Sequence, residues 1–232
     1  MKARRLLASA GLAFGLLVVA LFFFAPHLWL MRHDVPGSFE WARADNYLKQ
    51  CAAPFRRDIE PALHWRLLPA LVCYAGGLHG RAALALPWCG VVLMMMLAIH
   101  EFARRLGDWR LTALALVPLA TSSAALTPFQ FLGLNDAWAW LGLIATAFAS
   151  EPWALPLACL LGPWVDERFV LGFPLALIVR CLDRREPLRW RAALPALWLV
   201  PYVALRIAFI GDSSTRFFLT DAVRDSVHYL AM

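Results

Sequence analysis

The chain has 232 residues, of which 61% are hydrophobic and only 16% are charged, and its mean hydropathy is +0.61. Soluble domains average about 25% charged residues, so this composition excludes an ordinary soluble protein and indicates an integral membrane protein. The net charge of +6 lies largely in short runs beside apolar segments, which is typical of membrane helices and not of a nucleic-acid-binding surface. We therefore expect an all-α, polytopic transmembrane helical bundle with no nucleic-acid partner.

The first apolar run extends from Leu6 to about Met31 and follows a basic N-terminal segment. It is longer than the apolar core of a signal peptide, which has about 7 to 15 residues, and no A-x-A cleavage site follows it. We predict that residues 1–31 form an uncleaved first span with its N-terminus in the cytoplasm.

Residues 32–81 are predicted to form an outer loop that carries a surface helix. Positive and negative side chains are equal in number from 32 to 62, and Asp34 lies just past the first span. The apolar segment Leu63–Leu78 would cover only about 24 Å as a helix, at 1.5 Å per residue, which is short for a membrane crossing. We expect an amphipathic helix on the outer surface here.

Residues 82–210 are predicted to form the helical bundle, which brings the count to about seven spans, with short or re-entrant helices on the outer side. Residues 211–232 are predicted to be an outer tail. The expected spans of the bundle are Ala82–Ala103, Leu111–Pro128, Phe129–Ala149, Pro152–Trp164, Phe169–Leu182 and Ala192–Ile210.

Three consecutive ionisable residues, Asp166, Glu167 and Arg168, interrupt the apolar sequence between 152 and 182. At a bilayer centre the triplet would cost on the order of 9 kcal/mol, so a tight hairpin that brings it to a membrane surface or a wet cavity is expected. The hairpin also gives four crossings between the basic segments at 104–110 and 180–191. Both segments then lie on the cytoplasmic side, as the positive-inside rule requires.

With this topology, several charged residues that are far apart in the sequence fall on the outer side of the membrane and are expected to line one polar cavity. A carboxylate there can act as a general base or bind a metal, and an arginine can bind phosphate. The residues concerned are Asp34, Asp136 with its neighbour Asn135, Asp166, Glu167, Arg168 and Arg206.

Each of these residues also has a structural interpretation. Asp136 can be a helix N-cap, Glu167 and Arg168 can form a surface ion pair, and Arg206 can extend its side chain to the interface. Asp34 can be a solvated loop residue. His100-Glu101 is interpreted as a solvated or salt-bridged helix end, and the five cysteines as small packing residues.

Three motifs, in this order, resemble the GT-C superfamily of integral membrane glycosyltransferases, including its many uncharacterised bacterial members. Such proteins commonly show an Arg-x-Leu-x-Pro-like element after the first outer loop, an Asn/Asp pair in mid-chain, and an acid beside a base before an apolar run with proline. The matching residues are Arg66-Leu67-Leu68-Pro69, Asn135-Asp136, and Glu167-Arg168 followed by Pro174.

The resemblance implies an enzyme of the bacterial inner membrane that takes a sugar from a polyprenyl-phosphate donor on the extracytoplasmic side. The sugar would pass to a lipid or cell-envelope acceptor. Asp34 corresponds best to the family's acid in the first outer loop, which serves as base or as ligand to metal and phosphate. The doubled acidic motif of better-known members is absent, because the neighbour of Asp34 is His33.

In this hypothesis Asp34, Asp136, Asp166 and Glu167 do the catalytic work, and three arginines hold the phosphate: Arg66, Arg168 and Arg206. The need for a divalent cation is left open, and the chain's short length leaves room for a partner membrane subunit. The alternatives are a non-enzymatic lipid or solute transporter or flippase, and a structural membrane subunit in which the acids are caps and surface pairs.

Overall fold

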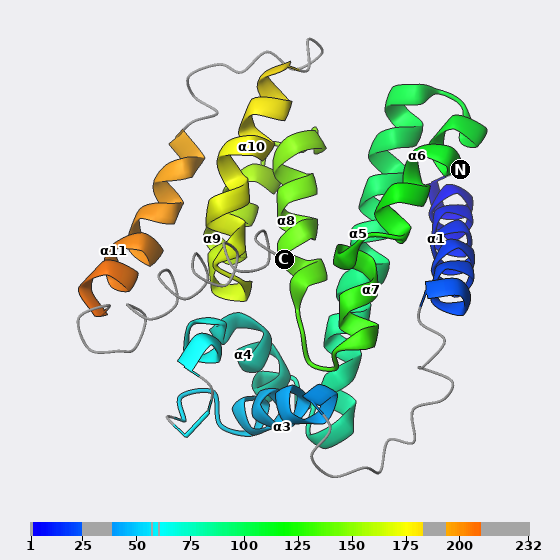
Figure 1. The fold of residues 1–232 in the computed structure, drawn as a ribbon. Helices are drawn as coiled ribbons and strands as arrows, with labels where there is room; N and C mark the ends of the chain where they lie inside the picture. The colour runs from blue at the N-terminus through cyan, green and yellow to red at the C-terminus, as the bar shows by residue number, and fades with distance from the viewer. Residues whose placement is uncertain (1, 25–38, 57, 60, 183–193, 210–232) are drawn as a thin grey trace, which may run out of the picture.

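The computed structural model describes residues 2–24, 39–56, 58–59, 61–182 and 194–209, and every regular element within these ranges is a helix (Figure 1). The all-α prediction is confirmed. The α-helices are α1 (Lys2–Phe24), α3 (Phe39–Ala52), α4 (Leu67–Ala75), α5 (Ala85–Leu106), α6 (Trp109–Ala120), α7 (Ser123–Gln130), α8 (Asp136–Phe148), α9 (Ala154–Val165), α10 (Arg168–Leu182) and α11 (Val200–Phe209); short 3-10 helices cover Pro61–Trp65, Gly80–Leu84 and Leu194–Leu199.

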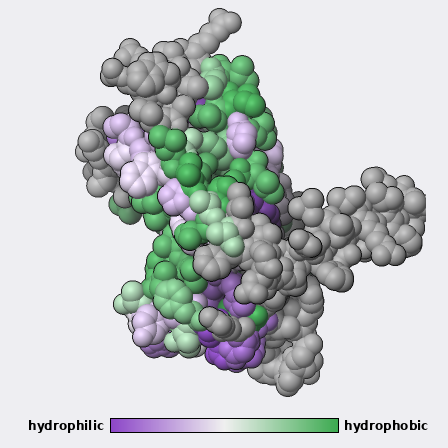
Figure 2. All heavy atoms as spheres, turned by 90° about the vertical axis from the view of Figure 1, so that its left-hand side faces the viewer, coloured by the Kyte–Doolittle hydropathy of each residue, from purple (hydrophilic) through white to green (hydrophobic). Residues whose placement is uncertain are grey.

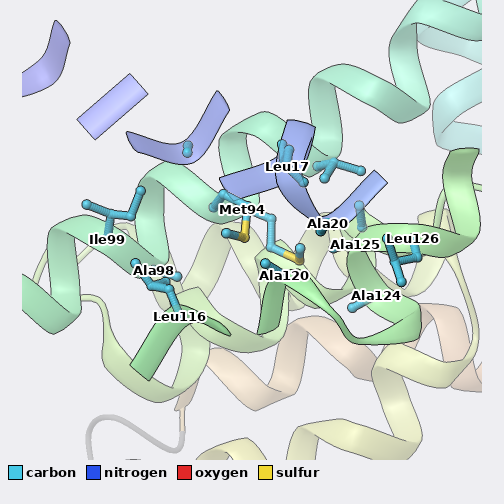
Figure 3. Packing of buried hydrophobic residues seen from close by; sticks show 14 of the residues in the cluster. Leu17, Ala20, Met94, Ala98, Ile99, Leu116, Ala120, Ala124, Ala125 and Leu126 are labelled. Carbon is cyan, nitrogen blue, oxygen red and sulfur yellow. The ribbon is translucent and has the colours of Figure 1, made fainter. Parts of the chain in front are cut away.

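The helices form two neighbouring groups joined through α5 and α8 (Figure 1). Helices α1, α5, α6 and α7 share one buried apolar cluster, in which Met94 and Met95 of α5 are fully buried (Figure 3). A second cluster joins α8, α9 and α10 around the fully buried Phe169. Helices α3 and α4 have a third cluster of their own and lie at one end of the bundle.

Glycines allow α8 to approach its neighbours closely. A Cβ at Gly90 of α5 would lie 2.6 Å from the Trp138 ring of α8, whose Nε1 donates a hydrogen bond to the Leu86 carbonyl. The Phe169 ring lies against Gly142 of α8 and Gly162 of α9 in the same way. Side chains larger than hydrogen at these positions would push the helices apart.

The predicted span Leu111–Pro128 is wrong as one helix, because α6 and α7 are bent by 55° at a short break. Pro118 removes one backbone donor from the last turn of α6. The hydroxyls of Thr121 and Ser122 then donate hydrogen bonds to the carbonyls of Val117 and Leu119, which offers the backbone an alternative to continuing the helix.

Three other predicted elements are also interrupted. The surface helix expected over Leu63–Leu78 breaks at Arg66, between a 3-10 turn and α4. The span expected from Phe129 begins as a helix only at Asp136, because Gly133 adopts a φ of +85° that ends the preceding turn. The last span divides into a 3-10 helix and α11.

The polar stretch after the first span contains a helix that its sequence did not indicate. Helix α3 buries Tyr47, Gln50 and Cys51 against α4 and the 3-10 turn at Gly80–Leu84. The prediction that the cysteines are packing residues holds for Cys51, Cys73 and Cys159. Cys89 and Cys181, in contrast, are exposed.

One helical stretch of the described residues, Gly80–Leu106, is long and apolar enough by itself to cross a membrane. The bent pair α6 and α7 would be a second if it forms one span. Shorter apolar helices occur at Gly11–Phe23, Asp136–Phe148 and Ala154–Val165.

Much of the surface is apolar. Figure 2 shows the face on the left-hand side of Figure 1, where hydrophobic residues cover much of the upper part and hydrophilic residues gather at the lower end. Leu171, Leu175, Ile178 and Leu182, spaced four, three and four residues apart, form an exposed stripe along α10, with exposed fractions of 55% to 79%. In a soluble protein such a stripe would face the core.

The two ends of the bundle differ in charge. The C-termini of α5, α8 and α10 lie together at one end (Figure 1). There Arg105 donates to the Phe148 carbonyl at 2.8 Å, and Arg180 donates to the Ala149 carbonyl at 2.8 Å. Both cations thus satisfy carbonyls at the C-terminus of α8 and stabilise its dipole. Glu101, only 2% exposed, is salt-bridged to Arg104, so this helix end is paired as expected but buried.

Candidate functional site

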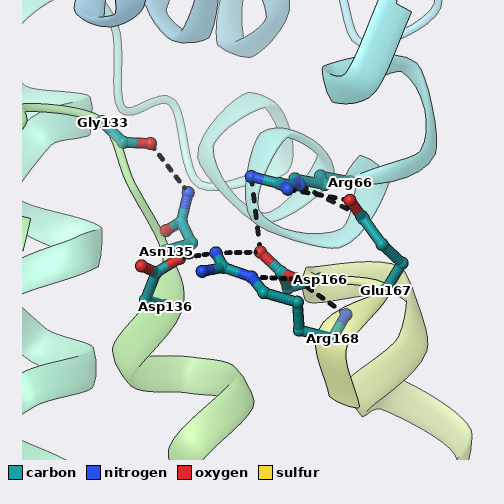
Figure 4. Close-up of polar contacts among 7 residues, drawn as sticks. All are labelled: Arg66, Gly133, Asn135, Asp136, Asp166, Glu167 and Arg168. Atoms are coloured by element: carbon teal, nitrogen blue, oxygen red, sulfur yellow. Dashed lines mark hydrogen bonds and ion pairs between the residues drawn. The ribbon is translucent and has the colours of Figure 1, made fainter. Parts of the chain in front are cut away.

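Five charged residues from three distant parts of the chain meet at the opposite end of the bundle (Figure 4). The break before α4 supplies one arginine, the start of α8 supplies one aspartate, and the turn between α9 and α10 supplies the other three residues. We call this group the charge network; its members are Arg66, Asp136, Asp166, Glu167 and Arg168.

Arg66 connects α4 to the turn between α9 and α10. Its guanidinium donates to both carboxylate oxygens of Glu167, from Nε at 3.2 Å and from Nη2 at 2.9 Å. Its Nη1 also lies 3.3 Å from Asp166 Oδ2. Because Arg66 ends one helical segment and begins another, its side chain is directed away from α4 and toward the two acids (Figure 4).

Arg168 makes the corresponding connection to α8. Its Nε and Nη2 donate to the two oxygens of Asp166 at 2.8 and 2.7 Å, and Nη2 also donates to Asp136 Oδ1. The backbone N–H of Arg168 donates to Asp166 Oδ1 at 2.9 Å, so this carboxylate also orders the turn before α10. Fork-shaped arginine–carboxylate pairs of this kind are the stronger hydrogen-bonded ion pairs.

The two aspartates of the network are buried, and Arg168 is its most exposed member. Asp166 is 1% exposed and Asp136 is 6% exposed, whereas the Arg168 side chain is 55% exposed. Burial by itself would raise the pKa of Asp166, but the hydrogen bond from Arg168 and the charge of Arg66 outweigh it and hold the pKa below its usual range. Asp166 is therefore ionised at neutral pH.

Two of the structural interpretations are wrong, the N-cap at Asp136 and the ion pair between Glu167 and Arg168. Asp136 is not an N-cap: Asn135 occupies that position without a side-chain cap, and Asp136 pairs with Arg168. Glu167 and Arg168 do not pair with each other, since Glu167 binds Arg66 and Arg168 binds the two aspartates. Nearest neighbours in the sequence point to opposite sides of the turn (Figure 4).

Beside the network lies a group that we call the aromatic seam, formed by Trp65, Trp164, Tyr202 and Arg206. The Tyr202 ring stands edge-on to both tryptophans, with centroid distances of 6.4 and 5.0 Å. The Arg206 guanidinium lies over the Trp65 ring at 4.6 Å. Trp65 adjoins Arg66 in the chain, so the seam and the network are continuous.

Several buried polar atoms at this end have no hydrogen-bond partner among the described residues. They include the Tyr202 hydroxyl, Arg206 Nη1 and His64 Nε2 in or beside the seam, and Asn135 Oδ1 beside the network. Buried polar groups are normally paired, so an unpaired group calls for an explanation, such as a ligand or water. Two of these unpaired atoms, the Tyr202 hydroxyl and Arg206 Nη1, can donate hydrogen bonds and lie beside the rings of Trp65 and Trp164.

The three carboxylates of the charge network do not fit a divalent cation. All three face arginine guanidiniums, which occupy the positions that a metal ion would need, and no group of three or more metal-ligating side chains occurs in the described ranges. The donor set is thus suited to holding arginines. Asp34, the acid expected in the first outer loop, lies outside the described residues.

Six residues predicted from the sequence lie together at one end of the bundle: Arg66, Asp136, Asp166, Glu167, Arg168 and Arg206. The aromatic residues between them were not predicted. A signal existed: Tyr202 lies four residues before Arg206 and therefore on the same helical face. Trp65 directly precedes Arg66, and Trp164 lies two residues before Asp166.

The chain matches no known family model, no curated protein and no solved structure. The assignment of a function therefore depends on the geometry of the network and the seam.

Proposed function

We propose that this protein is an integral membrane transferase that moves a sugar from a polyprenyl-phosphate donor to a lipid or cell-envelope acceptor. The observation that carries the proposal is the meeting of the charge network and the aromatic seam at one end of an apolar helical bundle. This combination offers cations for a phosphate, carboxylates for proton transfer and aromatic faces for a sugar ring or lipid.

The apolar surface supports a membrane location. Large hydrophobic side chains remain exposed on α1, α6 and α10, and on α10 they form a continuous stripe. Contiguous exposed apolar surface of this kind marks contact with lipid or another apolar partner. With the basic end in the cytoplasm, the network and the seam face the extracytoplasmic side of the bacterial inner membrane.

Each group then has a role. Arg168, whose side chain is partly exposed, binds the donor phosphate together with Arg66 and Arg206. The acceptor hydroxyl gives its proton to a carboxylate, and its oxygen attacks the anomeric carbon. The bond from that carbon to the phosphate oxygen breaks, and the polyprenyl phosphate leaves with the electron pair, stabilised by the arginines. Asp34 is the base that the family resemblance implies; Asp136 is the candidate among the described residues.

Transfer of labelled sugar from a polyprenyl-phosphate donor, measured in membranes, tests the proposal. Asp34→Asn and Asp136→Asn should each lower the rate by about 100-fold or more, within the range that one general base contributes. Asp58→Asn is the matched control, because that acid is exposed and pairs with Arg56 away from the network. Wild-type membranes that transfer no sugar from any such donor would reject the function, and unchanged turnover in both test variants would reject the assigned bases.

A structural subunit is the alternative that a specific observation favours. All five charges of the network pair with one another, which is what a clamp between α4, α8 and the α9–α10 turn requires. If the network is only a clamp, Asp136→Asn should lower the unfolding temperature and have no separate effect on turnover. If the protein is a transferase, Asp136→Asn should lose turnover while the protein is still folded. The unpaired seam atoms favour the transferase.

A further inference from the structure

Two cysteines on neighbouring helices lie side by side in the cluster between α3 and α4. Cys51 is 1% exposed and lies near the end of α3, and Cys73 is fully buried in α4. Both residues belong to one buried cluster, which forms where α3 packs on α4. The other buried cysteine of the described residues, Cys159, belongs to a different cluster on α9.

Tyr47 holds this pair in place. It lies one helical turn before Cys51 on α3, and its hydroxyl is 3.4 Å from Cys73 Sγ. The hydroxyl also donates to the Ala83 carbonyl at 3.4 Å. The tyrosine therefore fixes the face of α3 that carries Cys51 against the residue of α4 that carries Cys73.

We propose that Cys51 and Cys73 form a disulfide that ties α3 to α4 in the mature protein. The pair lies at the end of the bundle opposite the basic segments, which is the extracytoplasmic side if the membrane orientation of the proposed function holds. Disulfides form and persist in that compartment. The packing of α3 on α4 brings together two cysteines that are 22 residues apart in the sequence, as a disulfide requires.

The oxidant is a disulfide-bearing thiol oxidoreductase that acts while the segment folds. The thiolate of Cys73 is the attacking group. It forms a mixed disulfide with the oxidoreductase and releases one of that enzyme's thiols. Cys51 then loses its proton and attacks the Cys73 sulfur, and the second oxidoreductase sulfur leaves as a thiol. Two electrons pass from the cysteine pair to the oxidant.

The disulfide would act on the candidate site through α3. The Tyr47 side chain packs on Gly133, where an added Cβ would lie 2.9 Å from the tyrosine Cβ. The Gly133 carbonyl accepts a hydrogen bond from Asn135, the residue before Asp136. Fixing α3 against α4 therefore also fixes the loop that leads into the charge network.

Sequential alkylation of the full-length protein tests the inference. Cells are quenched in acid, and free thiols are blocked with N-ethylmaleimide under denaturing conditions; the protein is then reduced, labelled with iodoacetamide and analysed by mass spectrometry. We expect Cys51 and Cys73 to carry the second label and Cys159 to carry the first. Maleimide on both Cys51 and Cys73 would overturn the inference.

Two single variants serve as controls. In Cys51→Ala the remaining Cys73 should change to the first label, and in Cys73→Ala the remaining Cys51 should do the same. Reductant should lower the unfolding temperature of the wild type by several degrees and leave that of both variants unchanged. An equal response of the wild type and the variants would contradict the disulfide. None of these readouts depends on sugar transfer, so they separate this inference from the proposed function.

Discussion

At the scale of single residues, Asp166 connects the site. Its carboxylate accepts hydrogen bonds from the side chain and the backbone of Arg168 and is 3.3 Å from Arg66, while the residue is almost fully buried. Buried ion pairs cost desolvation energy, so what they contribute is geometric specificity more than stability. Breaking one is nevertheless expensive, because the remaining charge stays buried.

Replacing Arg168 by methionine should therefore destabilise the protein. Asp136 loses the one arginine that contacts it among the described residues, and Asp166 keeps only Arg66. We expect a loss of about 2–4 kcal/mol, below the full cost of breaking a buried pair because the arginine side chain is 55% exposed. Thermal unfolding in detergent measures this change. Arg56→Met, at an exposed pair, is the control and should leave the unfolding temperature unchanged.

The lowered pKa of Asp166 predicts a pH dependence of stability. A carboxyl whose pKa is lower in the folded than in the unfolded state stabilises the fold above the unfolded value of about 3.9. This contribution is lost as the pH falls through the folded pKa. The unfolding temperatures of the wild type and of Asp166→Asn should thus differ by a constant amount from pH 7 to about 4 and converge below that. Convergence already above pH 5 would mean that the pKa is raised instead.

At the scale of elements, the α9–α10 hairpin places the network. Helix α9 ends at Val165 and α10 begins at Arg168, and Phe169 inserts its ring against glycines of α8 and α9. The charge cost predicted the hairpin from the sequence alone. The short α8 was not predicted, because the extra residues expected at its N-terminus form the loop around Gly133.

A Cβ at Gly162 should loosen this hairpin. It would lie 2.5 Å from Phe169 Cδ2, and the buried ring has little room to move. Gly162→Ala should cost about 1–3 kcal/mol of unfolding free energy, and the added change Phe169→Leu should recover part of that loss. Gly15→Ala is the matched control: it is also a glycine within a helix, but nothing lies within 4 Å of its added Cβ. Equal destabilisation by both changes would show that the close contact is not the cause.

At the scale of the whole molecule, charge is divided between the two ends of the bundle. Arg105 and Arg180 meet at the C-terminus of α8, and the charge network lies at its N-terminus. Four crossings were predicted between the two basic segments, which puts both on the same side of the membrane. The helices at which these segments begin, α5 and α10, end at the same end of the bundle, on either side of α8 (Figure 1).

Labelling from outside intact cells tests the orientation. The exposed Cys181 follows Arg180 at the basic end. An added cysteine, Arg56→Cys, follows α3, and α3 lies at the opposite end of the bundle. A membrane-impermeant maleimide should label position 56 in intact cells and Cys181 only after permeabilisation, as read by mass spectrometry of the peptides. Labelling of both positions to the same extent in intact cells would contradict a membrane-spanning bundle with this orientation.

The sequence by itself determined the helical class, the hairpin at 164–168 and the set of charged residues, because apolar runs and the cost of charge in lipid are local properties. Only the tertiary structure decided which charges pair. Glu167 binds Arg66 and not its neighbour Arg168, and Tyr202 stands between two tryptophans more than 90 positions apart, because helix packing and not sequence distance sets which side chains meet. The same reason explains why Cys51 and Cys73 belong to one buried cluster: nothing in their spacing reveals that α3 and α4 face each other.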